Sequence, residues 1–200
     1  MNKLTITILS LNFLFGIISL PDFDSFNWKN IQRKDVVVDY FEEDGVQWCR
    51  SYLESDYSIL EISRVLENKS NYPNVFDRIT ETILYTDDIV HIKLDLPFPW
   101  AGRDYIIKYT ESSSENSKEY NFIHHDDLGV PVEDGYVRLH RAAGRWKLIK
   151  LPNGKTQVEY IWNGELLGDF PSWALKLAWK EQGSEVLTWL IDYMDDINEK

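Results

Sequence analysis

Apolar residues alternate with polar ones over much of the chain, which is the pattern of strands that bury one face. Such runs cover about residues 36–40, 46–52, 90–96, 103–109, 120–125, 136–140, 146–151 and 156–162. Asn153-Gly154, between the last two runs, is a strong hairpin signal because both residues tolerate a positive φ. Consecutive strands joined by short turns predict an antiparallel sheet.

Two regions have helical spacing instead. Apolar residues recur every three or four positions between residues 59 and 66, and residues 74–78 predict a short further turn. The longest helix is predicted at the end of the sequence, where Pro171 suits a first helical position and an apolar stripe extends to residue 194. A polar stretch around Gly183 predicts that this helix is weakened or bent there. A long helix laid across a curved sheet leaves a central gap, which side chains or a ligand must fill.

Composition narrows the range of functions. Hydrophobic residues make up 44% of the chain and charged residues 27%, which is typical of a globular protein. The net charge of −12 argues against nucleic-acid binding, which needs basic side chains to neutralise phosphates. It also argues against stable docking on anionic lipid, so we expect membrane contact to be transient. The eight Trp, eleven Tyr and nine Phe suit either a solid core or a lined pocket.

Neither disulfide nor metal chemistry is expected. Cys49 is the only cysteine and is interpreted as a small buried residue. His124 and His125 precede two aspartates, but neighbouring residues on a strand point to opposite faces, so the two imidazoles are badly placed to share an ion.

The first twenty residues have the pattern of a secretory signal. Lys3 supplies a positive start, an apolar run extends to Leu20, and Pro21 begins an abrupt polar boundary. We therefore predict a signal peptide at residues 1–20, with an uncleaved anchor as the alternative, and one domain over residues 22–200. Export to a bacterial periplasm or cell surface is the location that follows.

Three blocks in the second half of the chain resemble the START (StAR-related lipid-transfer) domains. The first is residues 97–105, a proline-containing turn followed by Arg103-Asp104-Tyr105. The second is Gly144-Arg145-Trp146, which stands eight residues before the Asn153-Gly154 hairpin. The third is residues 168–174, a glycine, a proline and a tryptophan that lead into the last helix. The order and spacing of the blocks over residues 85–195 carry the resemblance.

The resemblance implies an α+β helix-grip fold, in which a curved antiparallel sheet wraps around a long C-terminal α-helix and encloses a hydrophobic cavity. It implies that one lipid, sterol or similar apolar molecule binds there without a cofactor, behind a gate formed by the C-terminal helix and the loop of residues 126–135. Arg103 matches the arginine that phospholipid-binding members place against phosphate, and Trp162 falls where an aromatic lines the pocket. The lipid-binding residues expected here are Arg103, Tyr105, Ile107, Tyr109, Tyr160, Trp162, Trp173 and Leu177.

Two departures from the family pattern bear on the ligand. Some sterol-binding members carry a second arginine six residues after the first, and Tyr109 stands at that position here. This weakens a sterol-transfer interpretation. Residues 163–167 also depart from the usual acidic-glycine turn.

Other interpretations of the same residues remain open. Arg103 can instead pair with a surface carboxylate, and the aromatics can be ordinary core. The sequence contains no nucleophile elbow, no zinc-protease motif and no glycine-rich phosphate loop. We therefore expect a monomeric binding protein, which transfers its ligand or only holds it, rather than an enzyme. The alternatives are a cyclase- or hydrolase-type enzyme on the same fold, acting on a hydrophobic small molecule, and a sensor or scaffold that never transfers cargo.

Overall fold

The computed structural model describes residues 19–43, 45–125, 127–163 and 174–199. The strands are β1 (Lys29–Arg33), β2 (Val37–Glu43), β3 (Val46–Ser55), β4 (Ile79–Leu84), β5 (Ile89–Leu94), β6 (Gly102–Ser113), β7 (Ser117–His124), β8 (Tyr136–Arg138), β9 (Ala143–Lys150) and β10 (Thr156–Asn163). The helices are η1 (Phe23–Ser25), α1 (Ile59–Glu67), η2 (Lys69–Asn71), α2 (Tyr72–Val75) and α3 (Leu175–Asn198).

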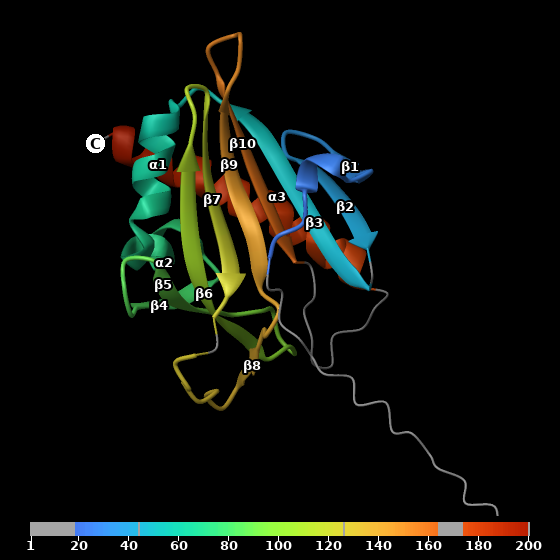
Figure 1. Ribbon diagram of the computed structural model, residues 1–200, viewed down its shortest axis with the longest axis vertical. Coiled ribbons are helices and arrows are strands. Elements are labelled where there is room, and N and C mark those ends of the chain that lie inside the picture. The colour runs from blue at the N-terminus through green and yellow to red at the C-terminus, as the bar shows by residue number, and fades with distance from the viewer. Residues whose placement is uncertain (1–18, 44, 126, 164–173, 200) are drawn as a thin grey trace, which may run out of the picture.

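One curved sheet holds the described strands, in the order β1-β2-β3-β10-β9-β7-β6-β5-β4. Neighbours along this path are antiparallel, and the short β8 pairs in parallel with β6. Figure 1 shows α3, in red, crossing one face of the sheet, while α1 and α2 lie at one side. The structure confirms the predicted α+β class, the antiparallel sheet and the C-terminal helix that the sheet wraps around.

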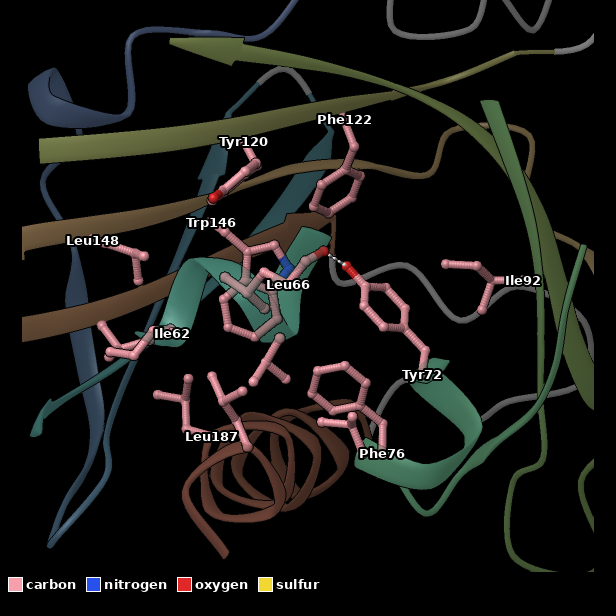
Figure 2. Close-up of a cluster of buried hydrophobic side chains, with 14 of the residues drawn as sticks. Ile62, Leu66, Tyr72, Phe76, Ile92, Tyr120, Phe122, Trp146, Leu148 and Leu187 are labelled. Atoms are coloured by element: carbon pink, nitrogen blue, oxygen red, sulfur yellow. Dashed lines mark hydrogen bonds between the residues drawn. The ribbon is translucent and has the colours of Figure 1, made fainter. Parts of the chain in front are cut away.

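The main core lies between the sheet and the helices. It includes Ile62 and Leu66 of α1, Trp146 and Leu148 of β9, and Leu187 of α3. Figure 2 shows these side chains converging from strands and helices that are distant in sequence. Ser58 begins α1 with a capping box, in which its hydroxyl accepts from the Glu61 amide and the Glu61 carboxylate accepts from the Ser58 amide.

Helix α3 is continuous through Gly183, so the predicted weakening at this residue is wrong. A Cβ added to Gly183 would lie 3.0 Å from the Trp162 ring and 3.3 Å from side-chain atoms of Ser51 and Val38. The glycine therefore serves close approach of the helix to β10, β3 and β2, and it does not mark a bend.

A second, smaller core covers the opposite face of the sheet. Phe23 packs there with Trp48, Ala143 and Ile161, and Leu20 lies against them. Leu20 falls inside the predicted signal peptide, so the packed structure begins slightly earlier than the predicted boundary. Residues 1–18 of that segment lie outside the described residues. Among the helices that are described, none has the length and apolar character needed to cross a membrane.

Candidate functional site

A cavity separates the sheet from α3 in the middle of the fold. Its volume is about 140 Å³, counted as the positions that the centre of a water molecule can reach. Strands β5, β6, β7, β9 and β10 form one wall, and α2, α3 and the segment before β9 close the others. The lining residues are mostly apolar, and they are Tyr72, Phe76, Arg78, Ile79, Ile92, Leu94, Arg103, Tyr105, Ile107, Tyr109, Phe122, Leu139, Arg141, Ala142, Ala143, Trp146, Tyr160, Trp162, Asn163, Gln182, Glu185, Val186 and Trp189.

Stacked aromatic rings form the sheet side of the cavity. Trp146 on β9 pairs in register with Tyr160 on β10, and their ring centroids are 4.3 Å apart. Tyr160 stacks in turn on Trp162, two residues along the same strand, at 5.0 Å. Phe122 of β7 extends the array, with its centroid 6.2 Å from that of Tyr160. The array is rigid and apolar, which suits a wall that must keep its shape when the space beside it is empty.

Gly144 makes room for this array. It stands between Phe122 on β7 and Trp162 on β10 in one row across the sheet. A Cβ at this position would lie 2.0 Å from the Ile161 carbonyl oxygen and 2.5 Å from Cζ of Phe122. The Phe122 ring therefore occupies space that a side chain of residue 144 would need.

Tyrosine hydroxyls supply much of the polarity inside the cavity. Tyr105 and Tyr109 alternate along β6, Tyr160 faces them from β10, and Tyr72 comes from α2. Burial raises the pKa of all four phenols, and neighbouring tyrosines raise those of Tyr109 and Tyr160 further, while at Tyr72 the interaction with Tyr109 opposes the rise. Figure 2 shows the Tyr72 hydroxyl donating to the Leu66 carbonyl, at 2.6 Å. At neutral pH the four phenols are therefore uncharged and act as hydrogen-bond donors.

Arg103 and Asp104 point to opposite faces of β6. Arg103 lines the cavity, is 2% exposed, and donates through Nη1 to the carbonyl oxygens of Ala101, at 2.6 Å, and Gly102, at 3.2 Å. Burial lowers the pKa of its guanidinium. Asp104 faces outward, where Oδ2 accepts from Nη2 of Arg138 at 2.7 Å and lies 2.9 Å from Nε2 of His91. Burial alone would raise the pKa of Asp104, but these two partners lower it below its ordinary value.

Asp104, His91 and Arg138 form a cluster on the outer face of the sheet, here called the outer cluster. It holds the loop that was predicted to be a gate. Arg138 also donates to the Val130 carbonyl, at 3.3 Å. Glu133 accepts from Lys93 of β5 at 2.5 Å, and the Gly102 amide donates to the Gly135 carbonyl at 2.9 Å. The described part of the loop, residues 127–135, is thus tied to the outer side of β5 and β6.

A separate ion pair connects α3 to the other side of the cavity. Nε and Nη2 of Arg78 donate to the two carboxylate oxygens of Glu185, at 2.8 and 2.9 Å. Both residues line the cavity, and both side chains remain partly exposed, 20% and 26%. The pair therefore closes the cavity where it meets solvent.

The structure brings most of the expected site residues together. Arg103, Tyr105, Ile107, Tyr109, Tyr160 and Trp162 all line the cavity, and Trp173 lies outside the described residues. Leu177 is placed wrongly by the prediction, because it is 64% exposed and does not line the cavity. It lies two positions from the buried Trp179, a rotation of about 200° around the helix, and so points away from the sheet.

Sequence reasoning missed other parts of the lining. Tyr72 begins the short helix α2 and Phe76 follows its last residue, and the helix is too short for its spacing to show which side is buried. Trp189 of α3 also lines the cavity, and the apolar stripe of the last helix did not indicate this. Trp146 lines the cavity as well, and the period-two run of residues 146–151 contained the signal for its face, which the prediction of site residues did not use.

Two of the histidines contact each other through their rings. The rings of His124 and His140 meet edge to face, with centroids 5.6 Å apart. Within the described ranges, no group of three or more His, Cys, Asp and Glu side chains is arranged to hold a metal ion. Cys49 is fully buried, as predicted, and burial raises the pKa of its thiol.

Comparison by sequence gives limited information. No family model matches the chain. A curated relative, Uncharacterized protein PA1579 of Pseudomonas aeruginosa, is 32% identical over 87 residues. The match covers 44% of this chain and 43% of the relative, so the chain spans less than half of the relative's length.

Comparison by structure is more informative. The STAR-related lipid transfer protein of Xanthomonas axonopodis superposes with a TM-score of 0.73 at 18% identity, covering 84% of this chain and 98% of its own. Human StAR-related lipid transfer protein 5 gives 0.76 at 14% identity, with 88% and 90% covered. The Zhui aromatase/cyclase of Streptomyces sp. R1128 gives 0.53 at 12% identity, with 75% and 94% covered. In its sheet and its C-terminal helix, the chain has the helix-grip fold of these START-related proteins.

Proposed function

We propose that the protein binds one small hydrophobic molecule, a lipid or similar apolar compound, in the cavity between the sheet and α3. The observation that carries this proposal is the cavity itself, enclosed by aromatic and aliphatic side chains from both layers. Each 100 Å² of apolar ligand surface removed from water there contributes roughly 2.5 kcal/mol. The START-like fold adds support, because the lipid transfer proteins named above share the same arrangement of sheet and helix.

We propose binding rather than catalysis. The raised pKa values keep the cavity phenols protonated, so they position a ligand and do not act as bases at neutral pH. Glu185, the carboxylate of the lining, is engaged by both donor groups of Arg78. A cyclase-type enzyme is the second candidate, favoured by the fold shared with Zhui aromatase/cyclase.

Native mass spectrometry of the purified full chain, followed by organic extraction, tests the proposal. Val186→Trp fills the cavity from α3, and Leu177→Trp adds the same ring on the exposed side of the same helix. We expect a stoichiometric small molecule on the wild type and on Leu177→Trp, and its loss from Val186→Trp.

Two outcomes would overturn the proposal. An apo mass that stays unchanged after incubation with mixed lipids would show that the cavity holds no such molecule. Conversion of the extracted compound into a new product by the protein would replace binding with the enzymatic alternative.

A further inference from the structure

The polar groups of the cavity define a second property of the ligand. Tyr105 and Tyr160 approach from different strands, β6 and β10, and both line the cavity. Within the part of the chain that the structure describes, neither hydroxyl has a hydrogen-bond partner. By contrast, the nearby Tyr72 hydroxyl donates to the Leu66 carbonyl.

Polar groups inside a protein are usually paired, because an unmade hydrogen bond costs free energy. Phenylalanine would fill the same space at Tyr105 and Tyr160 without that cost. Two neutral donors that face one apolar space are therefore matched to an acceptor that enters with the ligand. A carbonyl oxygen has two lone pairs and no donor of its own, so it satisfies both hydroxyls and leaves nothing unpaired.

The shape of the walls restricts the rest of the molecule. Trp146, Tyr160 and Trp162 stack on one another, so much of what they present to the cavity is the edges of their rings. Ring edges carry partial positive charge and prefer the faces of other aromatic systems.

We propose that the ligand is a flat apolar ring compound whose buried end carries a neutral carbonyl oxygen, bound jointly by the hydroxyls of Tyr105 and Tyr160. This inference rests on the proposed function, since it requires that the cavity binds a ligand. It assigns the polar contact of the buried end to two phenols. Arg103, whose Nη1 already donates to the carbonyl oxygens of Ala101 and Gly102, is not required for it.

A pair of probes that differ by one oxygen tests this. Fluorenone and fluorene have the same fused rings, and only fluorenone carries a carbonyl. Binding is followed by isothermal calorimetry and by quenching of tryptophan fluorescence, since Trp146, Trp162 and Trp189 line the cavity. We expect fluorenone to bind about 10-fold more tightly, the effect of two net hydrogen bonds at the low end of their usual strength.

Variants connect the preference to the two hydroxyls. Tyr105→Phe with Tyr160→Phe should abolish the preference for fluorenone, so that the double variant binds the two probes with equal affinity. Tyr85→Phe, at a partly exposed tyrosine outside the cavity, is the matched control and should keep the preference.

The outcomes separate the two proposals. Equal binding of both probes to the wild type, or a preference that survives the double substitution, overturns the carbonyl inference and leaves cavity binding intact. Failure of both probes to bind overturns the inference and also counts against the proposed function.

Discussion

The buried ion pair between Asp104 and Arg138 provides a sharp test of how the outer cluster supports the fold. The side chains are 3% and 4% exposed, and two guanidinium nitrogens of Arg138 donate to Oδ2 of Asp104, at 2.9 and 2.7 Å. Arg138→Met keeps the length and the apolar stem of the side chain but removes the charge. Among the described residues, the carboxylate of Asp104 then keeps only His91 as a hydrogen-bond partner.

The expected cost is large because a charge is left buried. Removing one partner of a buried ion pair typically destabilises by about 3–5 kcal/mol, a considerable part of the 5–15 kcal/mol available to a domain. Urea denaturation at pH 7, followed by tryptophan fluorescence, measures this difference. The control is Lys155→Met, which breaks the ion pair between Lys155 and Asp56. These side chains are 41% and 85% exposed, so the loss should be at most about 1 kcal/mol.

The pH dependence provides an independent check. Because the folded-state pKa of Asp104 is lowered, its contribution is present above the unfolded pKa, near 3.9, and is lost as pH falls through the folded value. Without Arg138 the buried carboxyl takes up its proton at a higher pH than in the wild type, so the gap in stability between wild type and Arg138→Met should narrow as pH falls from 7 to 3. A gap at pH 7 no larger than that of Lys155→Met, or one that is constant from pH 7 to pH 3, would refute this account.

Three further changes have defined outcomes. Gly144→Ala places a Cβ against the Ile161 carbonyl oxygen, a backbone atom with little room to shift, so thermal denaturation should show a loss of at least about 3 kcal/mol; near-wild-type stability would contradict the crowding. Arg78→Leu removes the partly exposed ion pair with Glu185, and the stability of the fold should change by less than about 1 kcal/mol. Exchange of a fluorescent apolar ligand, measured by stopped flow, should become several-fold faster. Unchanged exchange would show that this pair does not control access. Tyr105→Phe removes a hydroxyl that has no hydrogen-bond partner among the described residues, so the ligand-free protein should be equally stable or up to about 1 kcal/mol more stable. A clear loss of stability by calorimetry would reveal a structural role.

Strands in which apolar and polar residues alternate regularly were predicted from the sequence. On β6, residues 103, 105, 107 and 109 alternate with outward residues, and this alternation placed a whole row of the cavity wall. The edge strands β1 and β4 were missed for a related reason. Each has a register shift, between Asn30 and Gln32 in β1 and between Ile79 and Glu81 in β4, which breaks the period of two.

The contributions of the helices to the site were harder to predict. The apolar stripe of α3 is interrupted by Gly183, whose purpose depends on Trp162, a residue of another strand. The apolar stripe alone therefore did not show which side of α3 faces the sheet, and Leu177 was assigned to the wrong side. Tyr72 and Phe76 enter the cavity because α2 packs near α3, which is a long-range contact that local spacing does not encode.

The two elements that were expected to form the gate are held by different interactions. The loop of residues 127–135 is tied to the outer side of the sheet through Arg138, and separating Arg138 from the buried Asp104 would cost several kcal/mol. The Arg78–Glu185 pair at α3 is partly exposed and contributes about 1 kcal/mol or less. Helix α3 is held by more than this pair, because Trp179, Leu187 and Leu190 are buried in the core. Separation of Arg78 from Glu185 is therefore a low-cost local change, whereas movement of the whole helix would expose core surface to water.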